Sequence, residues 1–154
     1  MKQQTIPGLK TLGIAFCMGI AGITLTNTAL AQGPHPHYMK AISDLRAARW
    51  LIEHKTGNWV QAEEEHHAVK EIDAALREMQ DAAISDGKGM NDHPQVDERP
   101  DHEGRLRGAL DFLSRARDEV SRAEDNPHAR ELRNHSIHHI EEASHAIEKA
   151  MHHH

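Results

Sequence analysis

The last twenty residues of the chain, HSIHHIEEASHAIEKAMHHH, contain seven of its fifteen histidines. His135 and His139 are four residues apart, so a helix would place them one turn apart on one face, where they can chelate one divalent ion. His138, Glu142 and His145 follow a second stripe of the same segment at spacings of four and three residues. Imidazole and carboxylate donors without thiolates suit Zn, Cu or Ni. The segment therefore predicts a transition-metal site.

Further candidate ligands lie near the ends of the expected helices. In a bundle whose helices alternate in direction along the sequence, the first and third helices start where the second and fourth end. That end would gather His35, His37, His102 and the three histidines His152 to His154, with His93 of the loop as a further candidate. Near the other end, two histidines of the second helix, His66 and His67, would lie at about the depth of His135.

A glutamate and a histidine three residues apart form the helical motif of ferritin-like di-metal sites. The segment EEEHH, residues 63–67, contains this spacing twice, and Glu142 with His145 contains it once. With alternating directions the second and fourth helices run the same way, which would separate the motifs by ~15 Å. This topology predicts no shared di-iron centre, and the three glutamates are expected to stabilise a helix start through its dipole.

The sequence gives less support to haem binding or hydrolytic catalysis than to a metal site. The chain has no C-x-x-C-H motif for covalent haem attachment. A b-type haem between Met39 and His145 or His152 would have Tyr38 as its one evident bulky wall, so haem is disfavoured. No serine lies in a nucleophile elbow and no glycine-rich phosphate loop occurs, so we expect no catalytic activity.

Apolar residues at spacings of three and four predict four helices that would position these donors. The expected ranges are 37–55, 58–86, 101–123 and 126–154, with Asn58, Asp101 and Asn126 near their starts. One long loop, residues 87–100, is rich in Gly, Asn, Asp and Pro. The predicted fold is all-α, an up-down-up-down antiparallel four-helix bundle.

The front of the chain predicts export. A basic start with Lys2 and Lys10 precedes an apolar stretch and the sequence Ala29-Leu30-Ala31, a pattern typical of a secretory signal peptide cleaved after residue 31. The predicted organisation is a signal peptide at 1–31, a short leader at 32–36 and a four-helix domain at 37–154. We expect a periplasmic or secreted protein with no stable membrane span after cleavage.

The charge and the cysteine content argue against nucleic acid as a partner and against a disulfide bond. The chain carries 24 acidic and 18 basic residues, a formal charge of −6, which would become −8 without Lys2 and Lys10. An acidic protein lacks the basic face that nucleic acids require. The single cysteine, Cys17, lies in the expected signal peptide, so no disulfide is predicted.

Four short segments carry a resemblance: HPHY at 35–38, DLRAAR at 44–49, EDNPHAR at 124–130 and HIEEA at 139–143. They resemble a group of small exported bacterial helical-bundle proteins of uncharacterised function. The resemblance implies export and helices, and it carries no activity or ligand residues. The leading hypothesis is a non-catalytic metal buffer, carrier or sensor. Its alternative is a structural or interaction module, a stress chaperone or adaptor that binds an envelope protein.

Overall fold

The computed structural model describes residues 35–54, 60–82, 84, 87–123 and 127–152. These residues form four helices and no strand: α1 (Pro36–Glu53), α2 (Glu63–Asp81), α3 (His102–Ser121) and α4 (Pro127–His152). The predicted all-α four-helix fold is confirmed. The predicted signal peptide and most of the leader lie outside the described residues, and so do Asn58 and Asn126. No helix in the described part of the chain is long and apolar enough to cross a membrane.

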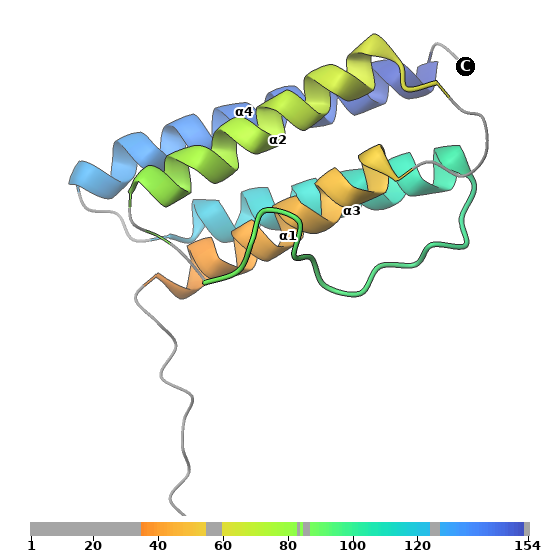
Figure 1. Ribbon diagram of the computed structural model, residues 1–154. Coiled ribbons are helices and arrows are strands. Elements are labelled where there is room, and N and C mark those ends of the chain that lie inside the picture. The colour runs from red at the N-terminus through yellow and green to blue at the C-terminus, as the bar shows by residue number, and fades with distance from the viewer. Residues whose placement is uncertain (1–34, 55–59, 83, 85–86, 124–126, 153–154) are drawn as a thin grey trace, which may run out of the picture. The chain divides into compact units, whose positions relative to one another are not determined.

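Each helix packs beside two antiparallel neighbours within the compact unit Ala31–His154 (Figure 1). Helix α1 contacts α2 and α3, and α4 contacts the same two helices. The start of α1 meets the end of α3, where His37 lies 2.7 Å from Glu119. The start of α2 meets the end of α4, where Glu64 lies 3.5 Å from Lys149. Helices α1 and α4 lie on one diagonal of the bundle, and α2 and α3 on the other.

Along the sequence, however, α2 and α3 run in the same direction, so the order is up-down-down-up. Both helices start at one end of the bundle, where Nε2 of His102 lies 2.9 Å from Oε1 of Glu65. Residues 82–101 connect the two helices, and the described residues 87–101 of this connection return along the bundle to that end (Figure 1). Twenty residues can span ~66 Å when extended, whereas the 19 residues of α2 rise only ~28 Å. The connection is therefore long enough for this return.

The returning segment is fixed along α1 by several contacts. Arg46 donates a hydrogen bond from Nη2 to the Lys88 carbonyl oxygen at 3.1 Å. The ring of His93 lies 4.9 Å from that of Trp50, and Met90 and Val96 pack against the core. The segment thus covers a face of α1 as an ordered crossover connection.

The core is aliphatic, as the scarcity of aromatic residues predicts. Its largest fully buried apolar side chains come from all four helices: Tyr38, Ile42, Leu45, Ile72, Leu76, Met79, Leu106, Leu113, Val120, Ile140 and Ile147. Buried alanines between them allow close approach of the helices. Burial of this apolar surface is the main term that stabilises the bundle, and it fixes which helix faces remain on the outside.

One helix starts within a residue of the position predicted from the sequence, and another starts later than predicted. Asp101 lies at the start of α3, as predicted, and it also caps the helix, because its side chain accepts a hydrogen bond from the Gly104 backbone amide at 2.9 Å. Helix α2 begins at Glu63, five residues later than expected, and no side chain caps it. Its first turn holds three glutamates. Their negative charges stabilise this turn by interacting with the positive end of the helix dipole.

Candidate metal site

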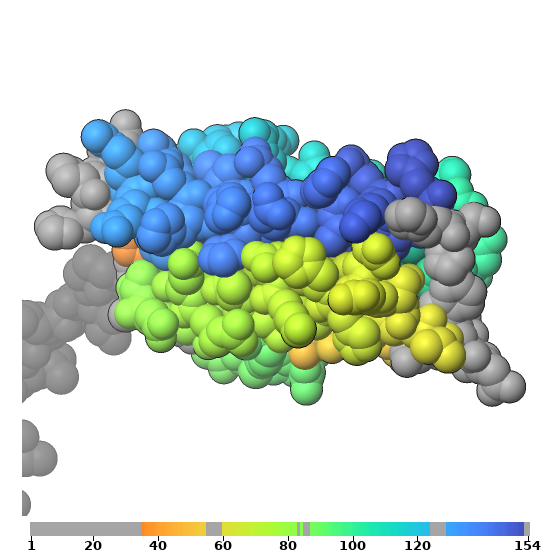
Figure 2. Space-filling view, turned by 90° about the horizontal axis from the view of Figure 1, so that it is seen from above, coloured from red at the N-terminus to blue at the C-terminus, as the bar shows by residue number. Residues whose placement is uncertain are grey.

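Helices α2 and α4 lie side by side along one face of the bundle (Figure 2). We call the polar boundary between them the α2/α4 seam. Its acidic, histidine and lysine side chains come from both helices: Glu63, Glu64, His67, Glu71 and Glu78 from α2, and His135, His139, Glu142, His145 and Lys149 from α4. The seam brings together five of the ten predicted ligands: His67, His135, His139, Glu142 and His145.

One end of the seam holds a cluster of His135, Glu78 and His139. Oε1 of Glu78 lies 3.5 Å from Nδ1 of His135 and 3.5 Å from Nε2 of His139. The predicted pair on α4 therefore faces a single carboxylate oxygen of α2. The side chain of His135 is 58% exposed and that of His139 is 24% exposed, so the cluster is open to solvent on one side.

A second carboxylate orients His139. Its Nδ1–H donates a hydrogen bond to Oε2 of Glu71 at 2.7 Å, which directs Nε2 toward Glu78. Nδ1 of His67 lies 3.8 Å from the other oxygen of Glu71. In metal sites, a carboxylate behind a ligating histidine fixes the tautomer and the ring orientation. Glu71 is positioned to act in this way.

The other end of the seam forms a surface pocket of about 440 Å³. Two of the three glutamate-x-x-histidine motifs line it together, with Glu64 and His67 on α2 and Glu142 and His145 on α4. The prediction that these motifs lie ~15 Å apart is wrong, because α2 and α4 run antiparallel. Nζ of Lys149 lies 3.5 Å from Oε1 of Glu64, so an ammonium group already pairs with one carboxylate of the pocket.

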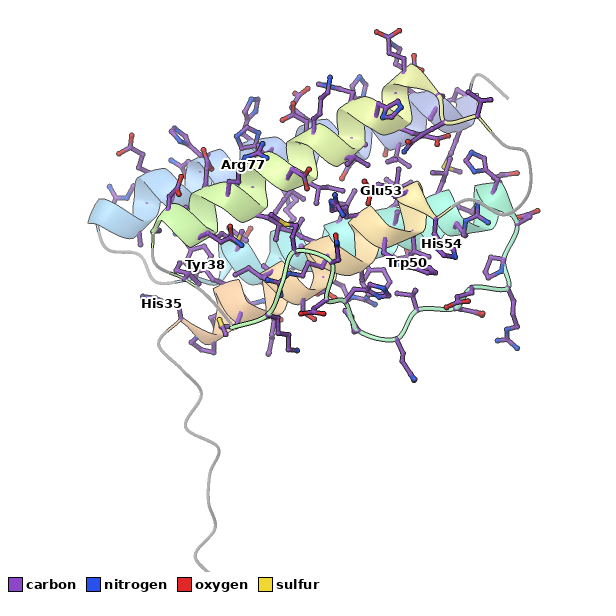
Figure 3. All side chains as sticks on the ribbon, viewed as in Figure 1. His35, Tyr38, Trp50, Glu53, His54 and Arg77 are labelled. Carbon is purple, nitrogen blue, oxygen red and sulfur yellow. The ribbon has the colours of Figure 1, made fainter. Side chains whose placement is uncertain are left out.

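The remaining predicted ligands do not converge. His66 and His138 are exposed beside the seam, and the ring of His138 lies 5.8 Å from that of His139. The start of α1, marked by His35 and Tyr38 in Figure 3, is at the opposite end of the bundle from Trp50 and His54.

The expected gathering of His35, His37 and His152 is therefore wrong, since the end of α4 lies with the start of α2 rather than with the start of α1. His37 instead donates a hydrogen bond to Glu119 at 2.7 Å. This hydrogen bond holds the pKa of the Glu119 carboxyl below its usual value, although burial opposes the effect.

Sequence reasoning missed the acidic partners Glu71 and Glu78. The two glutamates are seven residues apart, so they lie on one face of α2, which is a visible signal. Their partners depend on how far α2 is shifted along α4, and periodicity within one helix does not contain that information. The same applies to Lys149 in the pocket.

In the described part of the chain, no three His, Cys, Asp or Glu side chains already stand in an arrangement that holds a metal ion. Comparisons with protein-family models, curated proteins and solved structures find no match to this chain. The candidate function therefore depends on the geometry of the seam itself.

Proposed function

We propose that the chain binds a divalent transition metal at His135, Glu78 and His139, without catalysis, as a metal buffer, carrier or sensor. One observation carries the proposal. A single oxygen of Glu78 is equidistant, at 3.5 Å, from one ring nitrogen of each histidine. Two imidazole nitrogens and one carboxylate oxygen form a common donor set for Zn and related ions.

The observed spacing is close to that of a metal complex. Donors at 2.0–2.2 Å from a tetrahedral zinc ion are about 3.3–3.6 Å apart. Small rotations of the exposed His135 ring and of the Glu78 carboxylate would bring the donors to these positions. Glu71 would keep His139 oriented during this change, because its hydrogen bond is on the other ring nitrogen.

The choice of metal follows from the donor atoms. Nitrogen and oxygen donors without thiolate favour Zn, Cu(II) or Ni(II) over metals that prefer sulfur. The open side of the cluster gives a metal ready access, and it offers no enclosing wall that could orient a substrate. These features support binding rather than catalysis. Exchangeable binding of this kind suits the expected exported protein.

Calorimetric titration of the metal-stripped chain with Zn, Cu and Ni tests the proposal. We expect one stoichiometric site tighter than about 1 μM at about pH 7.5, and its loss at about pH 5.5, because ligating imidazole must be neutral. His139→Gln and Glu78→Gln should abolish this site. His138→Gln is the matched control, since the neighbouring ring lies outside the cluster.

The opposite result is equally clear. Weak uptake at several sites, lost when residues 152–154 are deleted and unchanged in His139→Gln, would contradict the proposal. That outcome would favour the alternative role, a structural or interaction module of the envelope. An absorption spectrum of the purified chain tests the minor haem alternative in the same experiment, since a bound haem gives a Soret band.

A further inference from the structure

We propose that the crossover connection is a pH-sensitive strap, which is held more tightly on α1 when His93 is protonated. We call the described residues 87–100 the crossover strap. It lies along α1 and leads to the start of α3 (Figure 1). The strap contains none of the residues of the α2/α4 seam, so the proposal is independent of the metal site.

The strap is attached to the bundle without a fully buried side chain of its own. Met90 and Val96 are half-buried and pack against the core. Nη2 of Arg46 donates a hydrogen bond to the Lys88 carbonyl oxygen at 3.1 Å. A segment that buries little apolar surface opens at a lower free energy than the whole domain unfolds. The strap can therefore open while the four helices stay packed.

A cluster of three rings joins the strap to α1. The ring centroid of His93 lies 4.9 Å from that of Trp50, and the two planes are inclined by 37°. His54, the residue that follows α1, stacks on the same indole with a centroid distance of 4.0 Å. Figure 3 labels Trp50 and His54 at this end of α1. Trp50 and His93 are both half-buried, so their contact is partly shielded from water.

Protonation changes the strength of the contact between His93 and Trp50. Nδ1–H of His93 donates a hydrogen bond to the Pro94 carbonyl oxygen at 2.8 Å, so Nε2 is the nitrogen that gains or loses a proton. An imidazolium against an indole gains a cation–π attraction that a neutral imidazole lacks. Histidine changes its charge between about pH 5 and 8. This attraction therefore holds the strap in acid and is lost as the pH rises.

The charged groups around the ring cluster come from α1, α2 and the strap. They are Arg49, Glu53 and His54 on or next to α1, Asp73 on α2, and Lys88, Asp92, Asp97 and Arg99 on the strap. Arg49 pairs with Glu53 at 2.7 Å and with Asp73 at 2.8 Å, and Arg99 pairs with Asp97 at 2.8 Å.

Among these groups, Asp92 directly precedes His93 in the chain and favours a proton on it, because carboxylates stay ionised over the range in which histidine titrates. A proton on His54, which contacts the same indole, opposes one on His93. The test therefore changes His93 alone and leaves His54 in place.

Opening of the strap changes one face of α1. Arg46 is only 3% exposed and bonds to the strap, and Trp50 carries the His93 ring. Both side chains would become more exposed when the strap opens. The inferred device is thus a face of α1 whose exposure increases as the pH rises.

Limited proteolysis of the full-length chain tests the proposal. A glutamate-specific protease cuts after Glu98, an exposed strap residue, and mass spectrometry follows this cut at about pH 5.5 and about pH 8. When opening and closing are fast, the cleavage rate follows the open population. His93→Phe keeps a ring beside Trp50 but cannot be protonated. Dividing the rate of the unchanged chain by that of His93→Phe removes the pH dependence of the protease itself.

We expect this relative rate to fall about two- to fivefold from the higher to the lower pH, the size of one partly exposed cation–π contact. His138→Gln, an exposed change on α4, should show the same fall as the unchanged chain. Trp50→Leu should lose the fall, because the imidazolium then has no indole to contact.

Three results would overturn the proposal: a relative rate that is equal at both pH values, one that rises in acid, or a fall that persists in Trp50→Leu. Circular dichroism at both pH values checks that each variant is folded. Should Trp50→Leu unfold, the fluorescence of Trp50 in a chain carrying Trp59→Phe decides instead. Acid must then quench this fluorescence more strongly with His93 present than with His93→Phe, and equal quenching refutes the contact.

Discussion

Replacing His102 by alanine should destabilise the metal-free bundle by leaving Glu65 buried without a facing partner. Removing one member of a buried ion pair costs about 3–5 kcal/mol. His102 is 20% exposed, and water entering its vacated volume would hydrate the carboxylate in part. We therefore expect about 3 kcal/mol, a large share of the 5–15 kcal/mol that stabilises a typical domain.

Urea unfolding in EDTA, followed by circular dichroism, measures this loss. With a slope of about 2 kcal/mol per molar urea, the midpoint should fall by about 1.5 M. Glu65→Met serves as the control, because it removes the buried charge and retains an apolar side chain of similar length. In the double variant, which combines His102→Ala with Glu65→Met, much of the loss in unfolding free energy caused by His102→Ala should disappear. The reason is that no buried charge is left without a partner.

Two results would refute this reasoning. A loss below about 0.5 kcal/mol for His102→Ala, the range typical of a surface change, would show that Glu65 does not depend on its partner. A double variant whose loss equals the sum of the two single losses would show that the side chains are not coupled.

Three further outcomes are expected. Lys149→Ala should let Zn(II) bind in the seam pocket in addition to the site proposed at Glu78, because it removes the ammonium beside Glu64; calorimetry that shows no Zn(II) uptake beyond that of the unchanged chain would contradict this. His37→Ala should lower the melting temperature near pH 7 and have a smaller effect in acid, once the Glu119 carboxyl is protonated in the folded state. The hydrogen bond lowers the pKa of Glu119, so its contribution is present above the ordinary carboxyl pKa and is lost as the pH falls through the folded-state pKa. An equal effect at both pH values would disprove the assignment. Asp101→Ala should cost about 1 kcal/mol in urea unfolding by removing the cap of α3, whereas Asp101→Asn should cost much less.

Much of the local structure could be predicted, because it depends on neighbours in sequence. The apolar spacing that predicted helices at 37–55 and 101–123 corresponds to α1 at Pro36–Glu53 and α3 at His102–Ser121. The cap at Asp101 was also predictable, since a capping side chain binds an amide only a few residues away. The late start of α2 at Glu63 shows the limit of prediction from residue type. Asn58 is a residue type that often caps helices, but the helix begins five residues after it.

The candidate site was also predictable only in the part that depends on neighbours in sequence. Spacing along α4 predicted that His135 and His139 share a face, and both face Glu78. Glu78 itself was not predicted, since its role depends on the register between α2 and α4, and its partners lie 57 and 61 positions further along the chain. The pairing of Glu65 with His102 was equally hidden, because it joins two helices on a diagonal of the bundle.

The sequence by itself determined the helices, their apolar faces and the local grouping of histidines with glutamates, because hydrogen bonds and side-chain periodicity act over a few residues. The tertiary structure alone decided which groups meet. The long connection after α2 could turn back at once or return along the bundle, and its sequence permitted both. Its return makes α2 and α3 parallel and α2 and α4 antiparallel. That single choice separates His37 from His152 and brings two of the glutamate-x-x-histidine motifs to one pocket.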